Sequence, residues 1–198
     1  LEVRHVDRLA DDLGRSGPAK TRVHRGISTS VDRLVAAGWS AGGQLAMLLG
    51  TVGRGSSRVA AVVSWSGPSD VTQMVTEDAR RADCAPDGDD CTDRDELATA
   101  FTAVMTCPPS ACTDRYAAAS PRSQVGSDDA PMLLATSDDE LIASSQATRM
   151  AAALQAVGLP VESLVLAGSR HGFDLRPYTR GAFASWLERY AVQPQSSP

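Results

Sequence analysis

Short, mainly apolar runs alternate along this chain with longer stretches in which apolar residues recur every three to four positions. The short runs lie at about residues 33–37, 59–65, 132–136 and 161–166. Runs of this length predict strands buried on both faces of a sheet. The longer stretches predict helices at about 42–52, 144–157 and 178–190. The alternation predicts an α/β fold with a mostly parallel sheet flanked by helices.

The N-terminal residues have a different pattern. Val3, Val6, Leu9 and Leu13 recur at helical spacing, so we predict a helix at about residues 2–13. The stretch from 14 to 30 is rich in Gly, Ser and Arg, which predicts a loop.

A Cys-, Asp- and Pro-rich insertion at about residues 70–127 interrupts the alternation, and only 95–105 within it has a helical pattern. The insertion follows the end of a predicted strand, so we expect a lid-like element above the edge where open α/β sheets bind ligands. Large apolar residues in or beside it are candidates for substrate contact or, alternatively, for core packing. These are Trp65, Met74, Phe101 and Met105.

A serine stands between two glycines in the segment Gly38-Trp39-Ser40-Ala41-Gly42. An apolar run precedes the segment and a helical pattern follows it, which is typical of a nucleophile elbow at a strand-to-helix turn. The strained apex needs neighbours without a Cβ, which would explain the glycines at 38 and 42. A glycine-rich turn with an incidental serine is the alternative.

A serine nucleophile needs a histidine as its base and a carboxylate that orients the histidine. His5 lies on the polar face of the predicted N-terminal helix and His24 in a basic loop, so both are expected at the surface, whereas His171 follows the predicted strand at 161–166. Three acids, Asp138, Asp139 and Glu140, follow the strand at 132–136. Because the carboxyl ends of parallel strands share one edge, we expect one of these acids to meet His171 there.

The order serine, acid, histidine resembles the α/β-hydrolase superfamily, in its bacterial carboxylesterase and prolyl-oligopeptidase-like branches. G-W-S-A-G-G at 38–43, S-G-P-S-D at 66–70, D-E-L-I at 139–142 and H-G-F at 171–173 are similar to segments of that family. In the family the acid opens a D-x-x-V-like tetrapeptide, so the resemblance implies the catalytic residues Ser40, Asp139 and His171, with Asp139 favoured over Asp138. It also implies that the Ala41 amide binds the oxyanion.

This resemblance implies a serine hydrolase that cleaves small-molecule carboxylic esters without a cofactor or metal. A prolyl-oligopeptidase-like peptidase is one alternative, and a catalytically impaired fragment that acts as a binding module is another. Family members have four strands and a His-Gly-Gly loop before the elbow, which the residues preceding 33 do not contain. We therefore expect an N-terminally shortened hydrolase whose nucleophile strand is an exposed edge, open to pairing in a homo-oligomer.

Length and composition restrict the domain count and the partners. The 198 residues, 42% of them hydrophobic, are enough for one core, so we predict a single domain at 1–192 and a disordered tail at 193–198. The net charge of −5 argues against nucleic acid or an anionic membrane as a partner. No apolar stretch has the length of a membrane span.

Four cysteines lie at positions 84, 91, 107 and 112. Their spacing does not fit a C-x-x-C zinc site, which leaves disulfides or free thiols. We expect Cys84 to pair with Cys91 and Cys107 with Cys112, because each pair closes a short polar loop. The clustering favours a secreted or extracytoplasmic protein whose leader is not part of this chain, with the cytoplasm as the alternative.

Overall fold

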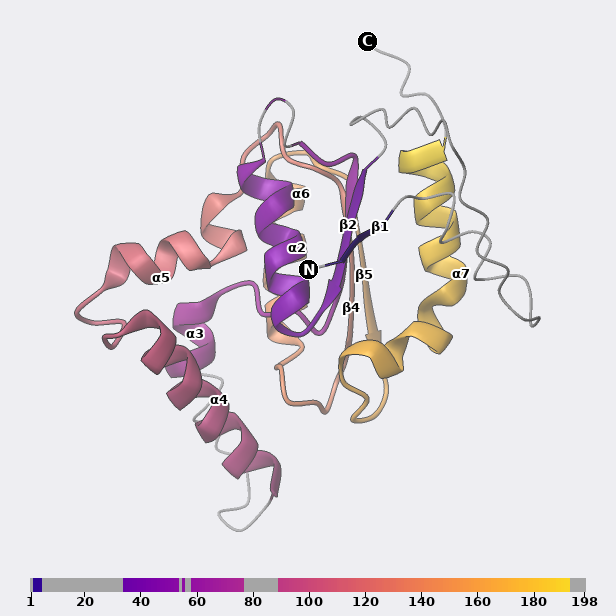
Figure 1. The fold of residues 1–198 in the computed structure, drawn as a ribbon. Helices are drawn as coiled ribbons and strands as arrows, with labels where there is room; N and C mark the ends of the chain where they lie inside the picture. The colour runs from indigo at the N-terminus through magenta and orange to yellow at the C-terminus, as the bar shows by residue number, and fades with distance from the viewer. Residues whose placement is uncertain (1, 5–33, 54, 56–57, 77–88, 193–198) are drawn as a thin grey trace.

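The structure is a computed structural model, and it describes residues 2–4, 34–53, 55, 58–76 and 89–192. These residues form a five-stranded sheet in the order β1-β2-β3-β4-β5 (Figure 1). The strands are β1 Glu2–Arg4, β2 Val35–Trp39, β3 Ala61–Trp65, β4 Met132–Ser137 and β5 Val161–Leu166. Strands β2 to β5 run parallel, and β1 is antiparallel to β2. The predicted α/β fold with a mostly parallel sheet is confirmed.

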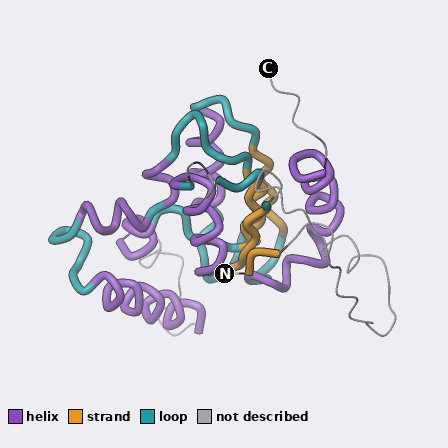
Figure 2. Tube along the Cα trace, turned by 45° about the horizontal axis from the view of Figure 1, so that its top comes forward, coloured by secondary structure: helices purple, strands orange, loops and turns teal. Residues whose placement is uncertain are grey.

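Helices cover both faces of the sheet, as Figure 2 shows. Helices α2 and α6 lie on one face and α7 on the other (Figure 1). In the described part of the chain the α-helices are α2 Ala41–Val52, α3 Val71–Thr76, α4 Asp89–Met105, α5 Thr113–Ala119, α6 Ser145–Ala156 and α7 Arg176–Leu187. Short 3-10 helices, η4 Pro121–Gln124 and η5 Gly172–Leu175, and a π-helix, η6 Glu188–Val192, complete the set. The helices α2, α6 and α7 lie close to the three ranges predicted from apolar spacing.

Alternate residues of the buried strands face two separate cores, because successive side chains of a strand point to opposite faces. Val63 and Leu133 pack in the cluster that contains Trp186 of α7. Their neighbours Val62 and Met132 pack in the cluster with residues of α2 and α6. Strands β3 and β4 are therefore buried on both sides, which is why their sequences read as continuous apolar runs. Strand β5 has no buried residue, so the prediction of burial on both faces is wrong there.

The N-terminal residues that are described form a strand, so the predicted helix at 2–13 is wrong at Glu2–Arg4. These residues pair with Arg4 opposite Val35, Val3 opposite Ala36 and Glu2 opposite Ala37. The outer edge of β2 offers unpaired backbone groups, and pairing there overrides a weak local helical spacing. The nucleophile strand β2 is therefore an inner strand, which corrects the expectation of an exposed edge there.

The insertion has a small core of its own. Its buried members are Val71, Met74, Met105, Tyr116 and Ile142. Ile142 belongs to the turn after β4, so the insertion packs directly onto the segment that follows this strand. Its action as a lid remains a prediction.

The four apolar residues considered as substrate contacts are part of this packing. Met74 and Met105 are buried in the insertion core, and Phe101 packs against it. Trp65 is buried in the α7 core, where its Nε1 donates a hydrogen bond to Thr179 Oγ1 at 2.8 Å. Core packing, the alternative named above, is thus their role in this structure.

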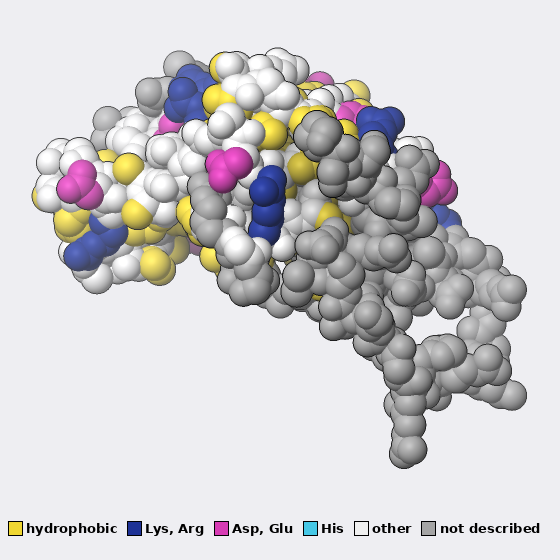
Figure 3. Space-filling view, turned by 90° about the horizontal axis from the view of Figure 1, so that it is seen from above, with side chains coloured by type: hydrophobic (Ala, Val, Ile, Leu, Met, Phe, Trp, Pro, Cys, Tyr) yellow, Lys and Arg dark blue, Asp and Glu magenta, His cyan; other side chains and the backbone are white. Residues whose placement is uncertain are grey.

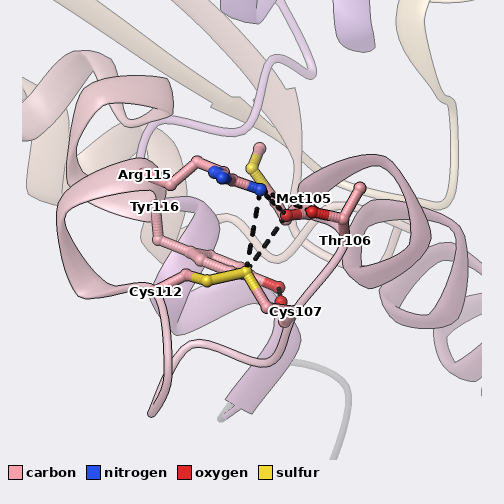
Figure 4. The surroundings of a disulfide bond; sticks show 6 residues. All are labelled: Met105, Thr106, Cys107, Cys112, Arg115 and Tyr116. Carbon is pink, nitrogen blue, oxygen red and sulfur yellow. Dashed lines mark hydrogen bonds between the residues drawn. A yellow bond between two sulfur atoms is a disulfide. The ribbon is translucent and has the colours of Figure 1, made fainter.

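A disulfide joins Cys107 to Cys112 in the corner between α4 and α5, which confirms this predicted pair (Figure 4). Arg115 points into the corner and donates to the Met105 carbonyl at 2.6 Å, so it caps the end of α4. Tyr116 Oη donates to the Cys107 carbonyl at 3.0 Å. The other predicted pair, Cys84 with Cys91, lies outside the described side chains, as do His5, His24 and the tail at 193–198.

Among the described residues on the face seen in Figure 3, basic and acidic side chains both occur, at several separate places. Among the residues that the structure describes, no helix is long and apolar enough to cross a bilayer.

Candidate active site

Ser40 occupies the turn between β2 and α2 in a strained backbone conformation. Its φ is 51° and its ψ is −128°, outside the regions that a residue with a side chain normally adopts. Its amide donates to the Trp65 carbonyl at 2.9 Å, and its carbonyl accepts from Gly43 at 2.9 Å. Strand β2 extends beyond the predicted end at 37, because Gly38 and Trp39 pair with Ser64 and Trp65. The serine therefore stands at the carboxyl end of an inner strand, in elbow geometry.

Glycine is required at 38 and at 43 of this turn. A Cβ on Gly38 would lie 2.2 Å from the Gly42 carbonyl oxygen, and one on Gly43 would lie 2.6 Å from Ser64 Oγ and 3.0 Å from Gly67 Cα. A Cβ on Gly42 would meet no atom within 4 Å. The expected steric need at 38 is therefore present, but the second crowded position is Gly43 rather than Gly42, because α2 turns residue 43 toward β3.

His171 comes to the same edge from the loop after β5. Gly172 and Phe173 of this loop lie beside Trp39, the residue before Ser40. A Cβ built on Gly172 would lie 3.2 Å from Trp39 Cδ1, and the ring centroids of Trp39 and Phe173 are 5.1 Å apart. The side chain of His171 is 31% exposed, and Ser40 is partly exposed. The structure thus brings the loops that carry Ser40 and His171 together at one accessible rim.

The carboxylate that meets His171 is Glu140, which corrects the expectation for Asp139. His171 Nδ1 lies 2.6 Å from Glu140 Oε2, and the Glu140 side chain is fully buried. Asp139 is exposed and its amide donates to the Gly168 carbonyl at 3.2 Å. Asp138 is also exposed, and its Oδ1 accepts from the Gly168 amide at 2.8 Å. Both aspartates therefore form hydrogen bonds with the turn after β5. Of the three acids, only Glu140 has a buried side chain.

The second oxygen of Glu140 is held by donors at the ends of β3 and β4. Oε1 accepts from Ser66 Oγ at 2.8 Å, from Thr136 Oγ1 at 2.5 Å and from the Ser137 amide at 2.8 Å. A buried carboxylate is costly unless it is hydrogen-bonded, and these donors supply the compensation. They leave Oε2 to accept the Nδ1 proton of His171, which fixes the tautomer in which Nε2 is free to take a proton.

Two further hydrogen bonds join the segment at 166–170, which precedes His171, to residues 137 and 138 at the end of β4. Ser137 Oγ donates to the Arg170 carbonyl at 2.9 Å, and the Asp138 amide donates to the Leu166 carbonyl at 2.9 Å. Among the residues now placed at this site, sequence reasoning missed Ser66 and Thr136. Ser66 stood within the recognised S-G-P-S-D segment, but nothing in the sequence indicated which partner its hydroxyl would take.

Ala41 is the first residue of α2, one position before the predicted start at 42, and its action as an oxyanion donor stays a prediction. The first amides of a helix have no partner within the helix, and they lie at the positive end of its dipole. Gly43 and Gln44 direct their amides to the Ser40 carbonyl, at 2.9 and 3.1 Å. The Ala41 amide follows directly after the serine, where a donor to an oxyanion is needed.

A family model described as BD-FAE matches residues 26–154, which include the elbow and Glu140. No curated protein sequence matches the chain.

Solved structures of hydrolases have the same fold. A truncated carbohydrate esterase from gut microbiota superposes with a TM-score of 0.58 at 20% identity, over 79% of this chain and 59% of that one. A puromycin-hydrolyzing peptidase of Mycobacterium tuberculosis gives 0.61 at 21% identity, over 98% of this chain and 24% of that one. The carboxylesterase Cest-2923 of Lactobacillus plantarum WCFS1 gives 0.55 at 12% identity, over 85% of this chain and 62% of that one. The chain thus spans less than two thirds of the length of each of these proteins.

Proposed function

Because the chain belongs to the BD-FAE family and has the α/β-hydrolase fold, we propose that it is a serine hydrolase that cleaves carboxylic esters through Ser40, His171 and Glu140. The observation that carries the proposal is the 2.6 Å contact between His171 Nδ1 and the buried Glu140 carboxylate, at the rim where Ser40 forms the strained elbow. A buried acid, a partly exposed histidine and a serine elbow at one sheet edge are components that acyl transfer uses, and their presence supports the proposal.

In the first half of the reaction, Ser40 Oγ attacks the acyl carbon of the ester while His171 Nε2 takes the hydroxyl proton. Glu140 accepts the Nδ1 proton in a hydrogen bond throughout, which stabilises the imidazolium that forms. The negative charge moves to the former carbonyl oxygen, where the Ala41 amide and the N-terminus of α2 stabilise it. When the tetrahedral intermediate collapses, the ester C–O bond breaks and His171 returns the proton to the departing alcohol.

In the second half, water replaces the serine hydroxyl as nucleophile. His171 takes a proton from the water, the hydroxide adds to the acyl carbon, and Ser40 leaves with the proton that His171 gives back. The products are a carboxylic acid and an alcohol, and no cofactor takes part in either half.

A peptidase is the second candidate, because the puromycin-hydrolyzing peptidase superposes over 98% of this chain. Short p-nitrophenyl esters, which release p-nitrophenolate, and peptide p-nitroanilides, which release p-nitroaniline, test the two activities by absorbance. Because serine peptidases also cleave activated esters, turnover of the esters without turnover of the anilides supports the proposal, and turnover of the anilides supports the peptidase.

A catalytically impaired chain that only binds is the third candidate. A fluorophosphonate probe reacts with a serine only when the serine is activated, so labelling of Ser40 in the wild type tests this directly. We expect labelling that is lost in Ser40→Ala and strongly reduced in His171→Ala. A folded wild-type sample that shows no labelling would support the binding module and contradict the esterase.

We also propose an extracytoplasmic location, supported by the Cys107–Cys112 disulfide, because such bonds persist in oxidising compartments. The proposed partner is a small-molecule ester, in keeping with the mixed charges of Figure 3 and the net charge of −5.

A further inference from the structure

One serine hydroxyl connects the carboxylate of the site to the histidine loop. Ser66 lies directly after β3, and its Oγ donates to Glu140 Oε1 at 2.8 Å. The same oxygen accepts a hydrogen bond from the Gly172 amide at 2.8 Å. Gly172 follows His171 in the chain. Ser66 Oγ is therefore hydrogen-bonded both to the Glu140 carboxylate and to the backbone beside His171.

The backbone of Ser66 is itself held in place. Its amide donates to the Ala135 carbonyl at 2.8 Å, and the residue is only 2% exposed. Its φ of 52° lies in the left-handed region, which is unfavourable for a residue with a side chain. Such a conformation persists only where the surroundings determine it, and here it turns the hydroxyl between Glu140 and Gly172.

We propose that Ser66 is a positioning residue that sets the distance and angle between Glu140 and the His171 ring. The inference rests on the proposed function, because it concerns the same histidine and carboxylate. Ser66 acts through these two groups and is not expected to touch the substrate, since its hydroxyl is buried beneath the rim.

The bonding pattern explains why no neighbouring group can replace this hydroxyl. Thr136 and the Ser137 amide also hold Glu140, but neither is hydrogen-bonded to the loop at 171–172 in the contacts described above. Ser137 Oγ holds the Arg170 carbonyl, on the other side of the histidine. Removing the Ser66 hydroxyl would leave the buried Gly172 amide without this acceptor and free the loop to shift relative to the acid.

Ser66→Ala removes the hydroxyl, and Ser120→Ala is a matched control. Ser120 is also buried, and its hydroxyl likewise donates to one oxygen, the Tyr116 carbonyl at 2.7 Å, and accepts from one amide, Val71 at 2.9 Å. It lies between the insertion helices and makes no contact with Glu140 or His171 in the described hydrogen bonds. Both variants lose one donated and one accepted hydrogen bond, although Ser66 donates to a carboxylate and Ser120 to a carbonyl. Both should be destabilised, and only Ser66→Ala should affect turnover.

For Ser66→Ala we expect kcat on a p-nitrophenyl ester to fall about 10- to 100-fold with little change in KM, because small misplacements of catalytic groups have effects of this size. Ser120→Ala should keep kcat near the wild-type value. Ser66→Gly should lower kcat equally while relieving the strain at φ 52°. In a Glu140→Gln background, Ser66→Ala should add almost no further loss, because both changes act on the same unit.

Equal kcat values for Ser66→Ala and Ser120→Ala would overturn the proposal, and so would full additivity with Glu140→Gln. A proton NMR measurement keeps this result separate from the fate of the esterase proposal. The His171 Nδ1 proton in its hydrogen bond to Glu140 should give a downfield signal in the wild type, lost in Glu140→Gln and shifted or broadened in Ser66→Ala. If the wild type hydrolyses no ester, the esterase proposal fails, yet the signal still decides the role of Ser66: an unchanged signal in Ser66→Ala contradicts it.

Discussion

Replacing Glu140 by glutamine is expected to reverse the tautomer of His171 while leaving the shape of the site intact. The carboxylate accepts from donors at both oxygens, whereas an amide offers one oxygen and one NH₂ group. An NH₂ group at the Oε1 position would face the fixed amide of Ser137 at 2.8 Å, donor against donor. The amide oxygen therefore takes that position, and the NH₂ group faces His171 Nδ1.

The histidine must then accept at Nδ1 and carry its proton on Nε2, where it cannot take the proton of Ser40. In a serine protease triad, the same exchange of acid for amide lowers kcat about 10⁴-fold. This corresponds to about 5.4 kcal/mol of transition-state stabilisation, at 1.36 kcal/mol for each factor of ten. We expect a loss of this size for Glu140→Gln. Glu140→Asp keeps the charge but withdraws it by about one bond length, so about 10²-fold is expected there.

Steady-state hydrolysis of a p-nitrophenyl ester measures these losses, and thermal unfolding confirms that each variant is folded. Asp139→Asn is the matched control, because Asp139 is the neighbouring acid, is exposed and does not contact His171 in the described bonds. Its turnover should change by about 2-fold or less. The reasoning is refuted if Glu140→Gln keeps more than a tenth of the activity, or if Asp139→Asn loses as much as Glu140→Gln.

Three further predictions concern the elbow and the insertion. Gly38→Ala should destabilise the fold by roughly 1–3 kcal/mol or more, while Gly42→Ala is tolerated, since a Cβ meets backbone 2.2 Å away at 38 and nothing within 4 Å at 42; urea unfolding measures both. Ser40→Gly should abolish probe labelling yet raise stability by about 1 kcal/mol, because it relieves the strained φ of 51°; a lower melting temperature would argue against strain. Replacing Cys107 and Cys112 by serine should lower the free energy of unfolding by about 2 kcal/mol, as expected for a sequence separation of 5; an unchanged denaturant midpoint would contradict this.

The strands and helices around the sheet were predictable because local spacing reports burial. Residues 59–65 and 132–136 are apolar at nearly every position, and β3 and β4 are buried on both faces. The elbow turn at Ser40 and the place of His171 in the loop after β5 followed from the same pattern, since both follow predicted strands. The disulfide between Cys107 and Cys112 was predictable because the two residues are too close in sequence to move far apart.

The tertiary structure decided what depends on direction and on partners distant in sequence. Three acids follow β4, and only folding determines that Glu140 points to His171 while Asp139 faces solvent. Glu2–Arg4 form a strand because β2 offers an edge, which a helical spacing of valines does not reveal. A sequence records which side chain occurs at each position, and so it determined the elements and the kinds of chemistry available. Ser66 and Glu140 are 74 positions apart in the sequence, and their hydrogen bond depends on the fold. They meet because Ser66 follows β3 and Glu140 follows β4, which are neighbouring parallel strands.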